Sequence, residues 1–269
     1  MAKRTTAHST ARRAWITGAS TGIGAAFARR LARDGWHLTV VARDRERLES
    51  LAAELHHAHG IEVTVRAADL TDAAARARIE RGLADDERLE LLVNNAGYGT
   101  AGAFATLDPE REEAEIDLNV VALVRLTRAA LPGLLRRRRG AVLNVSSLAA
   151  FQPGPHSATY AATKAFVNSF TEALHEELRG SGVLAMALCP GFTRTEFQAR
   201  AEIDTSAIPA AAWMSAEAVV DAALRGLARG DAVCVPGAAN WVVSNLVSAL
   251  PRGLVRRAIG LGAKRMFDK

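Results

Sequence analysis

Short apolar runs alternate with longer segments in which apolar residues recur every three or four positions, from about residue 14 to residue 235. The short runs are rich in Val, Ile and Leu, as buried strands are, and the longer segments have the period of amphipathic helices. Strands that alternate with helices form a doubly wound parallel sheet covered by helices on both faces. The pattern predicts seven strands: Ala14–Thr17, Leu38–Val41, Ile61–Val65, Leu89–Val93, Ala141–Val145, Val183–Leu188 and Ala232–Val235.

Several helix ends are marked by residues that favour them. Gly35 stands where the first helix should end, because glycine readily adopts the left-handed conformation that terminates helices. Asp108 followed by Pro109 predicts a helix start, and Ser215 predicts the start of a helix that continues to about Arg229. No internal repeat or Pro/Gly-rich linker divides the chain, so we expect a single α/β domain.

The composition is that of an ordinary globular enzyme, with 49% apolar and 23% charged residues. The net charge of +5 comes from arginines spread over many helical segments, which indicates solvated surfaces and argues against nucleic-acid binding. Cys189 and Cys234 lie in apolar runs without metal-binding spacing, so we expect no metal and a reducing compartment. Because the chain has no apolar run of about 18 residues and no apolar signal core at its start, we expect a cytoplasmic protein.

A glycine-containing turn joins the first predicted strand to the helix after it. Glycines permit a tight turn and a close approach of the backbone to a pyrophosphate, which then lies at the positive helix N-terminus. This strand–turn–helix context predicts a dinucleotide-binding loop and hence a Rossmann-type fold. The loop residues assigned to cofactor binding are Thr17, Gly18, Ser20, Thr21, Gly22, Ile23 and Gly24.

The end of the second predicted strand indicates which dinucleotide is bound. An acidic residue at this point would bind the ribose hydroxyls of NAD. Here the small Ala42 is followed by Arg43, whose guanidinium can bind the 2′-phosphate of NADP. We therefore expect NADP(H) to be preferred over NAD(H), although Asp44, one residue later, keeps NAD(H) as the alternative.

Tyr160 and Lys164 lie four residues apart in a helical pattern, so both project from one helix face. A lysine cation near a phenol stabilises the phenolate and lowers the pKa of the tyrosine, which suits it to acid–base work. Lys164 is the only lysine between Lys3 and Lys264 in a chain that otherwise uses arginine. A compact ammonium can reach a ribose hydroxyl and a phenol together, which a guanidinium cannot do as well.

The order of these motifs resembles the short-chain dehydrogenase/reductase family. The resemblance spans about residues 14–235, and its elements are specific in combination even though each is short. It implies an NAD(P)-dependent oxidoreductase that acts on CH–OH groups or carbonyls. The motifs that carry it are the glycine loop, Asn94-Asn95-Ala96-Gly97, Ser147, Tyr160-x-x-x-Lys164 and Pro190-Gly191.

The resemblance also implies roles for single residues. Ser147 would polarise the substrate carbonyl, Tyr160 would give its oxygen a proton, and Lys164 would hold the ribose. Asn119 would support the lysine through a water molecule. The further cofactor-binding positions implied in the same way are Asp69, Leu70, Asn95, Ala96, Gly97, Pro190, Gly191, Thr193 and Thr195, with one of the two threonines reaching the nicotinamide.

Residues 192–213 occupy the place of the family's substrate lid, and their partly apolar character favours a lipophilic ketone or β-ketoacyl substrate. The apolar side chains are Phe197, Ile203, Ile208 and Trp213. The catalytic helix, residues 158–168, and the segment 194–196 are similar to those of bacterial reductases of long-chain keto-lipids, including mycolate-type reductases. The substrate is therefore expected to be a small-molecule carbonyl or alcohol of lipid-like character.

The chain divides into a flexible N-terminal segment, residues 1–13, a catalytic domain, residues 14–237, and an amphipathic helical extension, residues 238–269. In the extension, apolar residues are interleaved with basic ones. It either packs on the core or on another subunit, or makes a peripheral contact with an anionic membrane. The family resemblance implies a homodimer or homotetramer formed through residues 108–136 and 156–179.

The expected reaction is hydride transfer from NADPH to a carbonyl carbon, giving a secondary alcohol. Oxidation of an alcohol uses the same groups and is the alternative. A non-catalytic dinucleotide-binding sensor, or an epimerase or dehydratase that retains its cofactor, is also compatible with the fold. Intact Ser147, Tyr160, Lys164 and Asn119 argue against a sensor, which needs no proton-transfer groups.

Overall fold

The structure is a computed structural model of the 269-residue chain and describes residues 12–201, 205 and 208–267. The predicted flexible segment, residues 1–13, lies outside the described residues except for its last two. Ile203 of the predicted lid also lies outside them.

The described strands form one parallel sheet in the order β3-β2-β1-β4-β5-β6-β7. The single-domain Rossmann-type fold is confirmed. Chain order reverses between β1 and β4, and open α/β sheets bind ligands beyond the carboxyl ends of the strands at such a point. The strands are β1 (Arg13–Thr17), β2 (His37–Ala42), β3 (Val63–Ala67), β4 (Leu89–Asn94), β5 (Gly140–Val145), β6 (Val183–Leu188) and β7 (Val233–Cys234).

All seven predicted strands are present: β6 has the predicted bounds, five others differ by one residue at one or both ends, and β3 is displaced by two residues. β3 begins at Val63 rather than Ile61. Ile61 is buried in the core, but it lies in the short segment between Gly60 and the strand. The left-handed backbone of Gly60, with φ of 66°, ends the preceding helix. An apolar residue that is buried just before a strand has the same sequence pattern as a strand residue, so the predicted strand began at Ile61.

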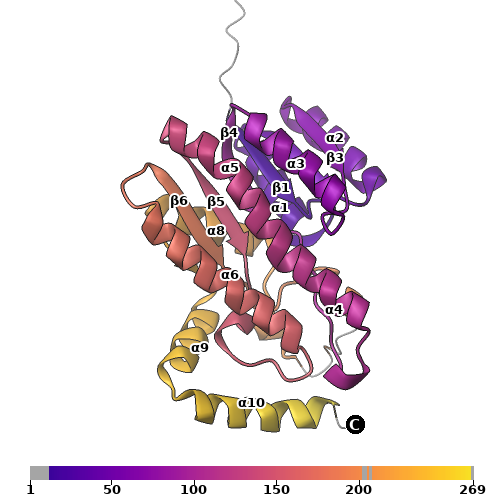
Figure 1. Ribbon diagram of the computed structural model, residues 1–269, viewed down its shortest axis with the longest axis vertical. Coiled ribbons are helices and arrows are strands. Elements are labelled where there is room, and N and C mark those ends of the chain that lie inside the picture. Colours follow the sequence, from indigo (N-terminus) through magenta and orange to yellow (C-terminus); the bar gives the residue numbers. More distant parts are fainter. Residues whose placement is uncertain (1–11, 202–204, 206–207, 268–269) are drawn as a thin grey trace, which may run out of the picture.

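Helices cover both faces of the sheet. On one face α1, α2 and α8 share a core that includes Leu51 and Val219. On the other face, turned toward the viewer in Figure 1, α3, α5 and α6 share a core that includes Ile79, Leu126 and Leu174. The helices are α1 (Gly22–Arg33), α2 (Arg45–His59), α3 (Ala73–Asp85), α4 (Pro109–Ile116), α5 (Leu123–Arg137), α6 (Ala158–Glu177), α7 (Phe197–Arg200), α8 (Ala216–Arg229), α9 (Ala238–Ala249) and α10 (Arg252–Phe267).

The predicted helix starts are confirmed by their caps. The Asp108 carboxylate accepts a hydrogen bond from the backbone N–H of Glu110, and Ser215 Oγ accepts one from the N–H of Ala218. α1 ends just before Gly35, whose φ is 78°. These local signals therefore give the correct end of α1 and the correct starts of α4 and α8 along the chain.

α4, the π-helical segment η2 (Asp117–Ala122) and α5 form one continuous helical stretch, Pro109–Arg137. Within the described part of the chain, this stretch alone is long and apolar enough to cross a membrane by length and composition. Core helices pass the same test, and Leu126 and Leu134 are fully buried against the sheet. Packing in the core accounts for its hydropathy.

Candidate active site

The predicted catalytic residues come from three elements near the carboxyl edge of the sheet. Ser147 follows β5 and starts the short 3-10 helix η3 (Leu148–Phe151), while Tyr160 and Lys164 lie one turn apart on α6. Lys164 Nζ is 5.7 Å from the centroid of the Tyr160 ring. A Cβ added to Gly97 would lie 2.8 Å from Oδ1 of Asn119 and 3.5 Å from Nζ of Lys164, so these side chains converge on Gly97.

The phenol of Tyr160 is held in its protonated form. Loss of hydration raises the pKa of Tyr160 to about 12, a hydrogen bond with Ser147 lowers it in part, and the charge of Glu115 raises it further. The prediction that Lys164 lowers the pKa of Tyr160 is therefore wrong for this structure. The reason is geometric: the ammonium donates to the carbonyl oxygen of Val145, at 2.9 Å, and not to the phenol.

Lys164 is 5% exposed, which is unusual for a lysine. Burial lowers the pKa of Lys164 to about 8, and the charge of Glu115 opposes that shift. The ammonium is thus protonated at neutral pH but close to its titration. A cation of this kind can hold ribose hydroxyls and exchange a proton with its surroundings.

Asn119 lies in the π-helical segment η2, and its side chain is fully engaged. Its Nδ2 donates to the carbonyl oxygen of Tyr98 at 2.8 Å and to Thr163 Oγ1 at 3.1 Å, and its Oδ1 accepts from the N–H of Tyr98 at 3.2 Å. The amide therefore anchors the loop after β4 to α6. π-Helical turns occur often at functional sites.

The glycine loop between β1 and α1 has the shape that a pyrophosphate requires. A Cβ on Gly24 would lie 2.2 Å from the carbonyl oxygen of Gly18, and Gly18 and Gly22 have φ values of 65° and 56°. Thr21 precedes α1 without a side-chain cap, so the first amide groups of the helix are open to an anion. Ser20 and Thr21 line the open surface beside it. The loop residues fit a dinucleotide.

Thr17 and Asn95 join this loop to the end of β4. Thr17 Oγ1 accepts from the N–H groups of Asn95 and Ala96, both at 2.9 Å, and Asn95 Nδ2 donates to the carbonyl oxygen of Thr17 at 2.9 Å. A Cβ on Gly18 would lie 2.7 Å from Asn95 Nδ2. The two loops are therefore one rigid unit across the switch point of the sheet.

The residues after β2 and β3 differ in how far they are free to bind a ligand. Arg43 has a side-chain exposure of 76% and lies 3.9 Å from Asp69. Asp44 caps α2, with its carboxylate accepting from the N–H of Arg47 at 3.0 Å. Asp69 accepts from both the N–H and the hydroxyl of Thr71, and Leu70 is buried.

Pro190 and Gly191 follow β6 and lead into the lid. Thr193 is buried and donates its hydroxyl to the carbonyl oxygen of Gly191, at 3.0 Å. A Cβ on Gly22 would lie 3.0 Å from Cγ2 of Thr195, so Thr195 lies directly over the glycine loop. Of the two threonines that the sequence left open, Thr195 is the one beside the cofactor loop.

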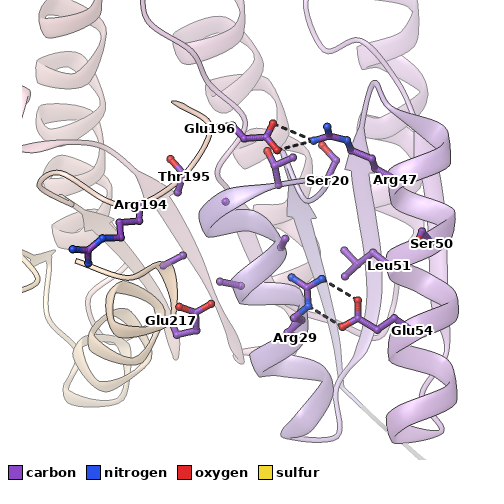
Figure 2. Close-up of a pocket in the computed structure, with 15 residues that line it drawn as sticks. Ser20, Arg29, Arg47, Ser50, Leu51, Glu54, Arg194, Thr195, Glu196 and Glu217 are labelled. Atoms are coloured by element: carbon purple, nitrogen blue, oxygen red, sulfur yellow. Dashed lines mark hydrogen bonds and ion pairs between the residues drawn. The ribbon is translucent and has the colours of Figure 1, made fainter. Parts of the chain in front are cut away.

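The segment predicted as the lid also contacts Tyr160 and the helix after β2. The rings of Phe197 and Tyr160 lie 5.5 Å apart. Arg47 on α2 donates to both carboxylate oxygens of Glu196, at 3.0 and 3.1 Å, as Figure 2 shows. A cavity of about 700 Å³ beside this ion pair is lined by residues of α1, α2 and the lid, but not by Tyr160 or Ser147.

Two features of the site were not predicted from the sequence. The Arg47–Glu196 pair joins positions 149 residues apart, for which no local pattern exists. Glu115 is fully buried close to Tyr160 and Lys164, and burial raises the pKa of Glu115 to about 7. Its position four residues before Asn119 was the available signal, because residues at that spacing share a helix face. Among the described residues, no group of three His, Cys, Asp or Glu side chains could hold a metal ion.

Comparisons with known proteins agree with this geometry. The sequence profile of the family described as short chain dehydrogenase matches residues 12–205. Serine 3-dehydrogenase from Rhizobium radiobacter is 40% identical over 185 residues, which are 68% of this chain and 72% of that protein. Very-long-chain 3-oxoacyl-CoA reductase from Anas platyrhynchos is 35% identical over 192 residues, 68% of this chain and 61% of the relative.

A solved structure extends the similarity to the C-terminal part. The short-chain dehydrogenase from Sphingobium yanoikuyae in complex with NADPH superposes with a TM-score of 0.81 and 39% identity. The match covers 90% of this chain and 97% of that one. These relatives differ in the substrates that their names give, so the substrate has to be argued from this chain's own residues.

Proposed function

We propose that this chain, which belongs to the short chain dehydrogenase family, uses NADPH to reduce a lipophilic ketone or β-ketoacyl carbonyl to a secondary alcohol. The observation that carries the proposal is the meeting of Ser147, Tyr160 and Lys164 at the carboxyl edge of the sheet, with the tyrosine and lysine one turn apart on α6 and the serine after β5. A proton donor is what carbonyl reduction needs. The oxidative alternative needs the same phenol deprotonated, which a pKa of about 12 disfavours at neutral pH.

The residues present account for each step other than the hydride, which the nicotinamide supplies when bound. Ser147 would donate a hydrogen bond to the carbonyl oxygen of the substrate and polarise it. Tyr160 would then give its proton to that oxygen as the alcohol forms. Lys164 would hold the ribose and help to relay a proton from solvent, because its own pKa of about 8 lies near neutral pH.

The preference for NADPH is proposed from the residues after β2. Asp44 is occupied as the cap of α2, so it would not compete for the ribose hydroxyls, and Arg43 is exposed directly after the carboxyl end of β2. Its guanidinium suits a 2′-phosphate. The NADPH in the Sphingobium yanoikuyae relative supports the same choice.

Replacing Arg43 by Ala is expected to lower kcat/KM for NADPH about 10- to 100-fold and to leave that for NADH nearly unchanged, since a hydrogen bond to a charged group contributes about 1.5–3 kcal/mol. Steady-state kinetics with both cofactors measures this. Arg45→Ala is the matched control, because Arg45 is also exposed and pairs only with Glu49 among the contacts seen. An equal loss with both cofactors would contradict the assignment.

The lipophilic character of the substrate is proposed from the lid. Phe197 lies against the ring of Tyr160, and Phe192 and Trp213 contact each other with ring centroids 5.6 Å apart. Aromatic walls next to the reacting group favour an apolar substrate body and exclude water. The name of the 3-oxoacyl-CoA reductase relative fits a substrate of this kind.

The extension, residues 238–269, is proposed to touch an anionic phospholipid surface. In Figure 1, α9 leads away from the sheet to α10, which runs across the end of the molecule. The sequence from Asn240 to Phe267 contains no Asp or Glu but five basic residues, which favours an anionic partner. Its exposed apolar side chains are Trp241, Val242, Val243, Leu246, Leu250 and Leu254, so they do not pack on the chain's own core.

The double variant Leu246→Glu/Leu254→Glu is expected to abolish pelleting of the full chain with vesicles that contain phosphatidylglycerol. Both leucines are more than half exposed, at 57% and 58%, so the fold should tolerate the change. Phe104→Glu, at a 66% exposed position elsewhere, is the control. Equal pelleting of all three proteins, or none, would contradict membrane contact. Concentration-dependent self-association lost in the double variant would instead identify a second copy as the partner.

Assembly and location are proposed from exposed apolar residues on the helices and from the extension. Ile116, Leu135 and Phe166 are exposed apolar residues on the helical segments that the family resemblance assigns to subunit contacts. We assign a homodimer or homotetramer to these segments. The proposed location is cytoplasmic, with peripheral attachment through the extension, and the catalytic domain is assigned to residues 14–237.

The proposal is tested by following NADPH consumption against small ketones, steroids and β-ketoacyl thioesters, with NADH for comparison. Turnover with apolar ketones or β-ketoacyl thioesters is the expected result. Turnover only with small polar carbonyls would contradict the substrate class. Tight NADPH binding without turnover across the panel would favour the non-catalytic sensor.

A further inference from the structure

Glu115 is a buried carboxyl group that the proposed mechanism does not use. It lies on α4 with no exposed surface, and its Oε2 accepts hydrogen bonds from both the N–H and the hydroxyl of Thr100, each at 2.8 Å. Its Oε1 is buried without a partner. A buried carboxyl group costs folding free energy, so its presence beside an active site calls for a function.

The loop that Glu115 holds is pressed against the catalytic side chains. One helical turn after Glu115, the amide of Asn119 binds both the N–H and the carbonyl oxygen of Tyr98. A Cβ on Gly99 would lie 2.9 Å from Cδ2 of Tyr160 and thus inside the ring's contact distance. Glu115 and Asn119 therefore clamp the segment Gly97–Thr100 from one helix, with Gly99 seated on the face of the tyrosine ring.

We propose that Glu115 is a positioning residue for proton transfer: through Thr100 it seats Gly99 against Tyr160, and it brings a buried carboxyl group to the surroundings of the phenol. This inference rests on the proposed function only in taking Tyr160 as the proton donor. It assigns Glu115 no contact with the substrate or the cofactor.

The charges that surround Glu115 are consistent with this role. Burial raises the pKa of Glu115 to about 7, nearby Glu112 raises it further, and Lys164 opposes these effects. In turn, the charge of Glu115 raises the pKa of Tyr160 and that of Lys164, whose environment also contains Cys189. Burial raises the pKa of Tyr98. The charges of Glu115 and Glu112 raise it further, and those of Arg111 and Arg43 lower it.

The sign of the effect follows from these charges. Above about pH 7 Glu115 is largely ionised, and an anion near a phenol disfavours the phenolate. Replacing Glu115 by Gln removes the charge, while the amide oxygen can still accept from Thr100. Tyr160 should then lose its proton at lower pH, so alcohol oxidation, which requires the phenolate, should begin at lower pH than in the parent protein.

The experiment compares Glu115→Gln, Glu115→Leu and Glu113→Gln in the full chain. Glu113 is exposed on the same helix, so its variant matches the charge change without the buried contact. The first readout is the pH profile of alcohol oxidation. The second needs no substrate: Tyr98→Phe leaves Tyr160 as the only tyrosine, and tyrosinate absorbance in that background reports its ionisation directly.

We expect Glu115→Gln to move both the oxidation profile and the tyrosinate titration to lower pH, with Glu113→Gln superimposable on the parent. Glu115→Leu, which loses the clamp, should lower kcat about tenfold or more with little change in KM. Titrations of Glu115→Gln and parent that coincide would overturn the inference, even if Glu115→Leu fails to fold. Failure of Tyr160→Phe to abolish turnover would instead overturn the proposed function, and the tyrosinate titration separates the two cases.

Discussion

Replacing Tyr160 by Phe is expected to lower kcat for carbonyl reduction about 10²- to 10⁴-fold, the range that a positioned general acid contributes. The substitution removes the hydroxyl and leaves the ring, so the contact with Phe197 and the close approach of Gly99 should persist. NADPH binding should therefore change by less than about threefold, because no packing on the glycine loop is lost.

The measurement is NADPH consumption at saturating ketone, together with NADPH affinity from fluorescence titration. Tyr98→Phe is the matched control, since it removes the only other tyrosine hydroxyl, which donates to the carbonyl oxygen of Arg111 at 2.7 Å. Its kcat should stay close to that of the parent. If Tyr160→Phe retained turnover comparable to the Tyr98→Phe variant, the proton would have to come from elsewhere.

Replacing Lys164 by Arg is expected to lower kcat about 10²-fold or more although the positive charge is kept, because a displacement of about 1 Å in a catalytic group has an effect of that size. The ammonium is 5% exposed and fits a single hydrogen bond to the carbonyl oxygen of Val145. A planar guanidinium is larger and would be driven toward Gly97, where even an added Cβ would lie only 3.5 Å from Nζ.

Lys164→Met provides the comparison, since it removes the charge with little change in length. Both variants should lose activity to a similar extent, with kcat measured beside the thermal unfolding midpoint to exclude loss of fold. Activity in Lys164→Arg within about threefold of the parent would show that charge alone suffices, contrary to the general difference between the two side chains.

The order of the elements could be predicted because most strands are short, largely apolar and buried runs, of which β6 is the clearest, and helical periodicity separates them. Caps such as Asp108 and Ser215 fixed helix starts, since their side chains act only on the next few residues. The start of β3 could not be placed as well, because burial of Ile61 does not distinguish a strand residue from one in the segment that precedes the strand.

For the site, spacing along one helix placed Tyr160 beside Lys164, and the glycines after β1 predicted the tight loop that the structure has. The pKa direction of Tyr160 could not be obtained this way, because it depends on where the ammonium points and on Glu115 from another helix. The contact of Arg47 with Glu196 likewise depends on the folded path of the lid. Such long-range contacts leave no periodic signal in the sequence.

The π-helical turn around Asn119 has a consequence for which sequence changes this chain can accept. An i→i+5 turn holds one residue more than an α-helical turn, and one residue rotates a helix by about 100°. The wider turn takes up this extra residue, so the helical segments on either side keep their rotational phase. Deleting one residue other than Asn119 between Asp117 and Ala122 should therefore leave Leu126 and Leu134 facing the sheet, while the turn becomes α-helical and Asn119 moves from its present position against Tyr98. Such a deletion should impair the site more than the core.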